Sequence, residues 1–340
     1  MRMDGRRESG NVDDRRGQRS GGSFGGGLGG NIFGGAGGGN GLSILSLILS
    51  ILSLSKSSRN GGGGKKGGGG CGCLTIIIIL VVGYFLFNMM SSGGLDLGSI
   101  INSGLIGEGG NQTYTESEYK GSDEEEALAT FAKQVFAGTE DVWSEIFAQN
   151  GLTYECPRLV LFTDRVSSGC GSASSSTGPF YCSADQCVYI DLSFFMDMKR
   201  TIGADGDFAY AYVIAHEVGH HVQYLLGDLT KIHNQQARSD EKTSNQLSVR
   251  LELQADFYAG VWAYHDNRMF KSLEDGDIEE AINAAQKIGD DYLQKKARGY
   301  TVPESFNHGT SAQRSKWLKK GIQTGNPSLG DTFSPSYGSL

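Results

Sequence analysis

The sequence lacks several features that would indicate other classes of protein. None of its six cysteines forms a CxxC pair, so a zinc-ribbon site is disfavoured. The basic residues near the N-terminus are not interleaved with aromatic residues, which argues against a nucleic-acid-binding arm. No convincing small-residue cleavage pattern follows the apolar run at residues 74–90, so a cleaved signal peptide is not predicted there.

Glycine is abundant, but it is concentrated at one end of the chain. Of the 52 glycines, 25 lie in the first 73 residues, in runs that carry little apolar surface. Such runs cannot bury enough surface to offset the entropy of ordering. The same 73 residues carry a net charge of +6, whereas the whole chain carries −8. We therefore predict that residues 1–73 are a flexible basic arm.

Two apolar segments interrupt this pattern. Residues 74–90 contain no charge, and with Cys71–Cys73 they approach the ~20 residues that a helix needs to span a bilayer. Lys65 and Lys66 precede the segment, so the positive-inside rule places residues 1–73 in the cytoplasm and residues 91–340 outside. We predict a single-pass transmembrane helix, with a buried core helix as the alternative. The shorter segment 42–54 is either an interfacial amphipathic helix or disordered low-complexity sequence.

Four further cysteines lie in the exported part of the chain. Four cysteines allow three pairings, and an oxidising compartment would form two bridges from them. We predict the pairs Cys170–Cys182 and Cys156–Cys187.

The remaining sequence predicts a mostly helical α+β domain with a small sheet. Residues 91–122 form a polar linker, residues 123–325 form the domain, and residues 326–340 form a flexible tail. Hydrophobic periodicity predicts long helices, and a capping box at Thr310 predicts a last, short one. The predicted helices cover residues 123–151, 207–227, 243–267 and 277–297, with a strand at 158–166 and a strand or hairpin within 180–195.

The stretch VIAHEVGHHVQ at residues 213–223 contains the HExxH pattern. On a helix, His216 and His220 project from the same face one turn apart, which suits two imidazoles bound to one zinc ion. Glu217 lies where it can remove a proton from a water molecule at the metal. The pattern is short, and an apolar helix that carries histidines by chance is the alternative.

A third ligand is expected on the next long helix. Glu252 and Asp256 lie one turn apart within an apolar stretch, where an unpaired carboxylate is costly. We predict that Glu252 completes the zinc site and that Asp256 forms a hydrogen bond to a ligand imidazole. The alternative is an exposed face on which these acids pair with Arg250 or Lys242.

Several motifs carry a resemblance to a known family. HEVGHH followed by ExxAD resembles the gluzincin-type metallopeptidases, and the chain as a whole is similar to the neutral zinc metallopeptidase family of bacteria. The shared stretches are RRESGNVDDRRG, SGCGSASSSTGPFYC, VYIDLSFF, GDFAYAYVIAHEVGHHVQ, ELQADFYAGVWA and NHGTSAQR. The resemblance implies a zincin-like fold, one zinc ion, and peptidase activity on proteins or peptides. Cys187 and the 42–54 segment depart from the family pattern.

These observations predict a zinc metallopeptidase of the bacterial inner membrane with an extracytoplasmic catalytic domain. His308, in the NHGTSAQR stretch, is predicted to line the cleft and stabilise the oxyanion, with a structural histidine as the alternative. Two other classes remain open. One is a catalytically silent, membrane-tethered zinc-binding module, and the other is a nucleic-acid-binding protein, against which the acidic second half argues.

Overall fold

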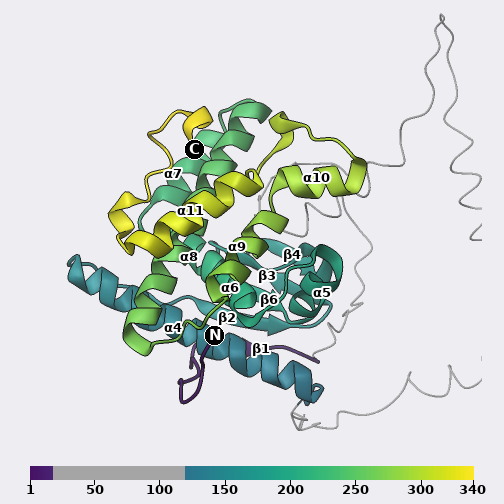
Figure 1. Cartoon of the computed structure of the whole chain (residues 1–340), viewed down its shortest axis with the longest axis vertical. Helices are drawn as coiled ribbons and strands as arrows, with labels where there is room; N and C mark the ends of the chain where they lie inside the picture. The colour runs from purple at the N-terminus through teal and green to yellow at the C-terminus, as the bar shows by residue number, and fades with distance from the viewer. Residues whose placement is uncertain (18–118) are drawn as a thin grey trace, which may run out of the picture. The chain divides into compact units, whose positions relative to one another are not determined.

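The computed structural model describes residues 1–17 and 119–340, which form helices around a small sheet (Figure 1). The helices are α4 (Asp123–Gln149), α5 (Ser193–Ile202), α6 (Asp207–Leu225), α7 (Asp228–Gln236), α8 (Glu241–Phe270), α9 (Asp277–Lys287), α10 (Asp290–Arg298) and α11 (Ser311–Thr324). The strands are β1 (Val12–Asp14), β2 (Arg158–Phe162), β3 (Arg165–Ser168), β4 (Gly171–Ser174), β5 (Phe180–Cys182) and β6 (Cys187–Asp191). The predicted mostly helical α+β class is confirmed.

The sequence signals mark the helix ends well. Ser122 caps α4 by accepting a hydrogen bond from the Glu125 amide, and Thr310 forms the expected capping box with Gln313 at α11. The helix predicted at 277–297 is instead two helices, α9 and α10. They are separated at Gly289, where a Cβ atom would overlap the backbone of Ser311 at the start of α11.

The main sheet is mixed and has the strand order β1–β2–β6–β5. Strand β2 pairs in parallel with β1 and β6, and β5 pairs antiparallel with β6 at the edge. Alternate residues point to opposite faces, as strand geometry requires. Leu159, Leu161 and Ile190 join the core beneath the helices, whereas Val160 and Tyr189 pack on the other face in a smaller apolar cluster.

Glycines allow the central helices to approach closely. A Cβ atom on Gly219 of α6 would lie 3.0 Å from the Ala255 carbonyl oxygen of α8. Between α8 and α11 the approach is closer still, because a Cβ atom on Gly260 or Gly321 would overlap the facing backbone. These contacts bring α6, α8 and α11 together, and Figure 1 shows α11 lying across α8.

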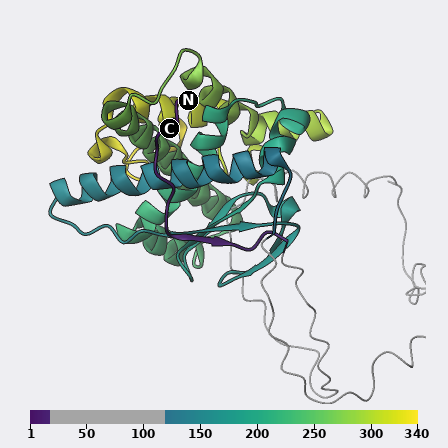
Figure 2. The same ribbon diagram turned by 90° about the horizontal axis from the view of Figure 1, so that it is seen from below.

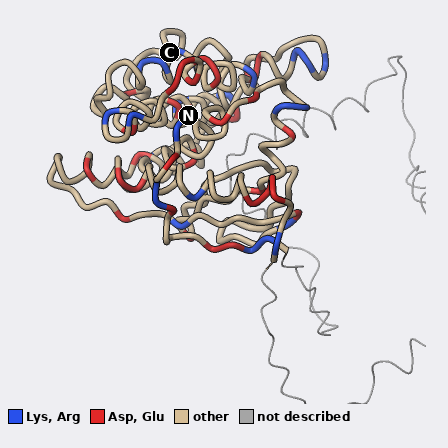
Figure 3. Tube along the Cα trace, turned by 60° about the horizontal axis from the view of Figure 1, so that its bottom comes forward, with Lys and Arg blue, Asp and Glu red and all other residues tan. Residues whose placement is uncertain are grey.

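The N-terminal residues correct the prediction of a flexible arm. Strand β1 adds to the sheet beside β2, and Figure 2 shows the N-terminal segment running beside α4 and the strands. Figure 3 shows basic and acidic positions close together along this segment, where Arg7 pairs with Glu140 and Arg16 with Glu126. The prediction is therefore wrong for residues 1–17.

The C-terminal residues correct a second prediction. Residues 326–340 were expected to be a flexible tail, but Thr332 is fully buried and Leu340 is buried at the edge of the core. Arg250 donates hydrogen bonds to the carbonyl oxygens of Phe333 and Pro335, at 3.1 and 2.9 Å. The tail is ordered because its carbonyl oxygens accept the hydrogen bonds of the Arg250 guanidinium. The alternative interpretation of the sequence had paired Arg250 with the acids of α8.

Of the two predicted disulfides, one is confirmed and one is wrong. Cys170 and Cys182 are bonded, whereas Cys156 and Cys187 are free. Cys187 points into the small cluster on the outer face of the sheet, and its thiol donates to the Asp185 carbonyl oxygen. Cys156 is exposed and lies near Ser144 and Glu140 of α4, on the helical side. The two sulfur atoms therefore lie on opposite sides of the sheet.

The predicted membrane segment lies outside the described residues, as do residues 42–54 and the linker up to residue 118. Within residues 1–17 and 119–340, no helix is both long and apolar enough to cross a bilayer.

Replacing Gly321 with alanine should destabilise the protein by about 1–3 kcal/mol, because the added methyl group forces α11 away from α8. Chemical denaturation of the Gly321→Ala variant measures the loss. The matched control is Gly10→Ala, where no atom lies within 4 Å of the added Cβ atom. Equal stability of the two variants would contradict the proposed role of this contact.

Candidate metal centre

Three side chains that were predicted to share a metal lie together between α6 and α8. The nearest contacts are 3.2 Å from His216 Nε2 to Glu252 Oε2 and 3.5 Å from His220 Nε2 to Glu252 Oε1. One potential ligand atom from each residue lies within 4.8 Å of those of the other two. All three side chains are buried, with 1–3 % of each residue exposed. The helical spacing and the Gly219 contact together produce this arrangement.

Asp256 occupies the position that was predicted for it, next to the first histidine. Its Oδ1 atom accepts a hydrogen bond from His216 Nδ1 at 2.9 Å. The other ring nitrogen, Nε2, faces Glu252 and keeps its lone pair free to bind a metal ion. Tyr212 donates to the same oxygen at 2.5 Å. This carboxylate therefore sets both the tautomer and the orientation of His216.

Arg314 of α11 holds Asp256 in place, and the sequence analysis did not identify this residue. Its Nε and Nη2 atoms bind the two carboxylate oxygens at 2.8 and 2.9 Å, and Nη2 lies 3.7 Å from Glu252 Oε2. Burial acts to raise the pKa of Asp256, but the charge of Arg314 and the hydrogen bonds from His216 and Arg314 outweigh it and lower the pKa to about 2. Asp256 therefore remains an anion despite its burial. Arg314 is the last residue of the NHGTSAQR stretch. Its place in that shared motif was the sequence feature that could have identified it.

Gln223 performs the corresponding role for the second histidine. Its Nε2 atom donates to the Leu251 carbonyl oxygen at 2.7 Å, so its Oε1 atom is free to accept from His220 Nδ1 at 2.9 Å. Leu251 directly precedes Glu252, and the amide thus links both ligand-bearing helices. Its spacing of three residues from His220 is the signal that sequence reasoning missed.

The charges of the buried groups fit a divalent cation. Glu217, Glu252 and Asp256 are buried carboxylates, and Arg314 is the buried cation beside them. With both histidines neutral, two negative charges remain without compensation, which is costly in a buried site. Oxygen and imidazole nitrogen donors of this kind are those that zinc prefers. The residues present therefore fit one zinc ion, with His216, His220 and Glu252 as ligands.

Glu217 lies within the same buried region and has an uncommitted oxygen. Its Oε2 atom has no hydrogen-bond partner among the described residues. Burial raises the pKa of Glu217, the two imidazoles oppose this effect, and a hydrogen bond from the Tyr181 backbone also lowers it. The net result is a pKa above the ordinary value. Strand β5, which carries Tyr181, thus borders the same carboxylate.

His308 is also buried beside this region. Its Nδ1 atom lies 3.4 Å from Asp290 Oδ1, and neither ring nitrogen forms a hydrogen bond within the part of the chain that the structure describes. Burial lowers the pKa of His308, but Asp290 and the charge of Glu252 outweigh it and raise the pKa overall. The loop is rigid, because Asp290 Oδ2 accepts the amides of residues 307–309 at 2.7–2.9 Å.

His221 is not part of the ligand set. Its Nδ1 atom forms a hydrogen bond with the Tyr181 hydroxyl at 2.9 Å, and Nε2 donates to the Glu155 carbonyl oxygen at 2.6 Å. Burial lowers its pKa to about 4, so the ring stays neutral. It connects α6 to β5 and to the chain before β2.

A second group of carboxylates has a different role. Asp207, Asp277 and Glu280 also lie within 4.8 Å of one another. The Met1 amino group donates to Asp207 at 2.8 Å and to Asp277 at 3.1 Å, while Glu280 accepts the Phe208 amide at the start of α6. These acids are compensated by groups of the chain itself, so we do not assign a metal to them.

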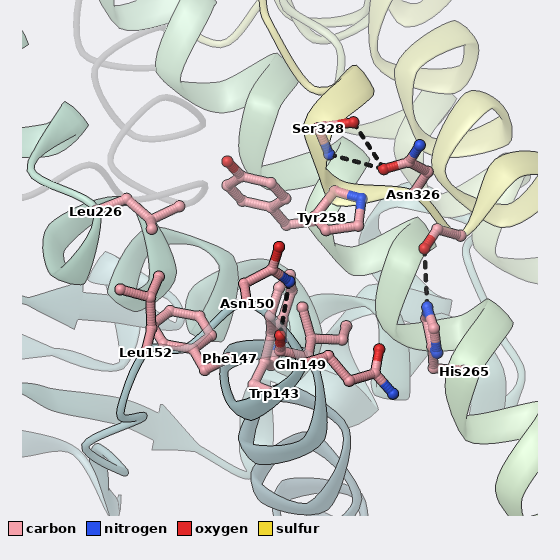
Figure 4. Close-up of a pocket in the computed structure, with 13 residues that line it drawn as sticks. Trp143, Phe147, Gln149, Asn150, Leu152, Leu226, Tyr258, His265, Asn326 and Ser328 are labelled. Carbon is pink, nitrogen blue, oxygen red and sulfur yellow. Dashed lines mark hydrogen bonds between the residues drawn. The ribbon is translucent and has the colours of Figure 1, made fainter.

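A pocket of about 610 Å³ lies at the end of α4, away from any of the predicted site residues. Figure 4 shows Phe147, Leu152 and Leu226 on one side and Asn326 and Ser328 on the other. No aspartate, glutamate, lysine or arginine lines it. The pocket lining therefore offers no carboxylate that could bind a metal ion or act as a general base.

Removing the Gln223 side chain should weaken zinc binding by about 10- to 100-fold, because His220 then loses the acceptor that sets its tautomer. Competition of the Gln223→Ala variant with a chromophoric chelator measures the affinity. Gln149→Ala on the exposed end of α4 is the control, and it should bind zinc as the parent does. An unchanged affinity in Gln223→Ala would show that this hydrogen bond does not position the ligand.

Comparison with known proteins identifies the family of the chain. The family described as putative neutral zinc metallopeptidase matches residues 50–333. YpfJ of Escherichia coli (strain K12), an uncharacterised protein, is 52% identical over 215 residues, which are 63% of this chain and 75% of YpfJ. Rv2575 of Mycobacterium tuberculosis (strain H37Rv), also uncharacterised, is 44% identical over 191 residues, 53% of this chain and 64% of its own. No solved structure matches. The chain belongs to the neutral zinc metallopeptidase family, and the cofactor of that family is Zn²⁺.

Proposed function

We propose that this protein is a zinc-dependent peptidase that hydrolyses peptide bonds in protein or peptide substrates. The observation that carries the proposal is the placement of Glu217. Within residues 1–17 and 119–340, its buried Oε2 atom has no hydrogen-bond partner, and Glu217 lies on the same turn as the ligand histidines, beside a group of three potential metal ligands. Catalytic zinc sites have three protein ligands and one open position, whereas structural sites are closed by four.

The chemistry is divided between the cofactor and the protein. Bound zinc supplies Lewis-acid polarisation of the scissile carbonyl and brings the pKa of water towards neutrality. Glu217 acts as the general base that takes the proton from the attacking water and then delivers it to the leaving amine. Its raised pKa suits both halves of this proton transfer, because the group must gain and lose a proton near neutral pH.

Strand β5 is placed to bind the substrate backbone. It is the edge of the sheet, so one side of it is not paired with another strand of the described chain. The backbone of Tyr181, in the middle of the strand, lies close enough to Glu217 to lower the pKa of that carboxyl. An extended peptide that added to this edge would pass beside the catalytic carboxylate, and such additions are a common mode of peptide recognition.

His308 is the second catalytic group in this proposal. Asp290 fixes the backbone of its loop and faces Nδ1, so the opposite nitrogen, Nε2, is left to donate a hydrogen bond. The loop of His308 lies against the part of α8 that carries Glu252, because a Cβ atom on Gly309 would be 3.2 Å from Val249 and 3.4 Å from Leu253. We assign His308 to stabilise the oxyanion that forms on the scissile carbonyl.

We also propose an extracytoplasmic location for the catalytic domain. The Cys170–Cys182 disulfide supports it, because such bonds persist in oxidising compartments and are rare in the cytosol. Attachment to the bacterial inner membrane rests on the apolar segments of the sequence. A catalytically silent zinc-binding module is the competing function, and a proteolysis assay distinguishes the two.

Glu217→Gln should retain zinc and lose about 10²- to 10⁴-fold in the rate of peptide hydrolysis, because the amide cannot take up the proton. Hydrolysis of casein and metal content are measured together, with the chelator-treated parent as the inactive reference. If the variant holds zinc and remains fully active, the general-base assignment is wrong. If the zinc-loaded parent cleaves no unfolded protein, the silent module is favoured.

His308→Ala should lower kcat by about 10²- to 10³-fold with little change in KM, since the lost hydrogen bond forms mainly in the transition state. His265→Ala is the matched control, because His265 bonds the Gly325 carbonyl oxygen at the separate pocket. Steady-state kinetics on a fluorogenic peptide gives both parameters. A change confined to KM, or a loss equal to that of the control, would contradict the catalytic role.

A further inference from the structure

The N-terminal segment, residues 1–17, is an integral part of the metallopeptidase domain. In the sheet, Val12, Asp13 and Asp14 pair in register with residues 159–161 of β2. Two backbone hydrogen bonds extend the ladder, from Leu159 N to Asn11 O at 2.9 Å and from Arg15 N to Leu161 O at 2.8 Å. Strand β2 is consequently covered on both edges, by β1 and by β6.

Two buried acids of the domain depend on this segment. Asp266 of α8 is fully buried and binds Arg6 Nη2 at 2.6 Å. The Glu140 side chain of α4 is also buried and accepts hydrogen bonds from Arg7, Ser9 and Asn11 at 2.6–3.0 Å. A buried carboxylate that loses its partner is strongly destabilising. The domain therefore requires the segment in order to satisfy its own interior charges.

The residues on either side of residues 18–118 lie next to each other in the structure. A Cβ atom on Gly17 would overlap the ring of Tyr119, so these residues are in direct contact. The Arg16 guanidinium lies 5.7 Å from the centre of the same ring and binds Glu126 of α4 at 3.1 Å. Gly17 and Tyr119, which flank residues 18–118 in the sequence, are therefore neighbours in the folded domain.

We infer that the metallopeptidase domain is discontinuous, formed by residues 1–17 and 119–340 in a single compartment. Hydrogen-bonded neighbours in one sheet cannot lie on opposite sides of a bilayer. Any membrane crossing made between residues 18 and 118 must therefore be matched by a return, so the number of crossings is even. Exchange of the segment between two copies would not alter this, because every copy of the segment would lie in the same compartment.

Cysteine labelling in the full chain tests the shared compartment. Glu8→Cys reports on the segment and Arg200→Cys on the domain, since the side chains they replace are 48% and 79% exposed. The background replaces Cys71, Cys73 and Cys156 with serine. Spheroplasts are treated with a membrane-impermeant maleimide before or after lysis. We expect both positions to react alike in intact spheroplasts. Reaction of one position before lysis, and of the other only afterwards, would overturn the inference.

A double-mutant cycle tests the docking itself and does not depend on peptidase activity. Arg6→Ala and Asp266→Ala, singly and together, are compared by the thermal unfolding midpoint of the zinc-loaded full chain. We expect the double variant to unfold no earlier than Asp266→Ala alone, because the two side chains act as one pair. Asp266→Asn replaces Asp266→Ala if the latter does not fold. Arg2→Ala, at an exposed position, should combine additively with either change at residue 266. Additive losses for the Arg6 pair would show that the segment is not docked.

Discussion

The buried ion pair between Arg314 and Asp256 is the interaction on which the site depends. It joins α11 to α8, and through His216 it reaches α6, so one guanidinium connects the three central helices. A bidentate arginine is suited to this role because its geometry fixes the carboxylate in one plane. The close helix packing at Gly219, Gly260 and Gly321 is what allows so short a connection.

The metal centre combines an anionic and a neutral partner for its two imidazoles. His216 donates to the Asp256 carboxylate, whereas His220 donates to the Gln223 amide. An anionic partner makes its imidazole a stronger electron donor than a neutral one does. Asp256 is the one carboxylate that is hydrogen-bonded to a ligand imidazole. Together with Glu217 and Glu252 it gives three negative charges, which one divalent ion and Arg314 neutralise. The second partner is therefore neutral for a reason of charge balance.

Compensation of buried charge also explains how the N-terminal segment, residues 1–17, is held in the domain. Buried acids on α4 and α8 are neutralised by arginines from the N-terminal segment, which is more than a hundred residues away along the chain from its partners. A charged side chain in the interior is costly unless it is paired with an opposite charge. Here the opposite charges are Arg6 and Arg7 of the N-terminal segment. The extent of the folded unit thus follows from its electrostatics as well as from its apolar core.

Local patterns were sufficient to predict most helices, the capping box at Thr310 and the spacing of His216, Glu217 and His220, because these depend on neighbours within one or two turns. Apolar context likewise predicted that Glu252 and Asp256 would be buried. Arg314, Gln223 and Asp290 were not found, since their partners lie on other helices or loops. The docking of residues 1–17, the order of the tail and the free Cys156 and Cys187 were decided by tertiary structure alone. Each of these features depends on which side chains of a distant helix or strand lie opposite the segment. The periodicity of residues within one segment does not contain that information.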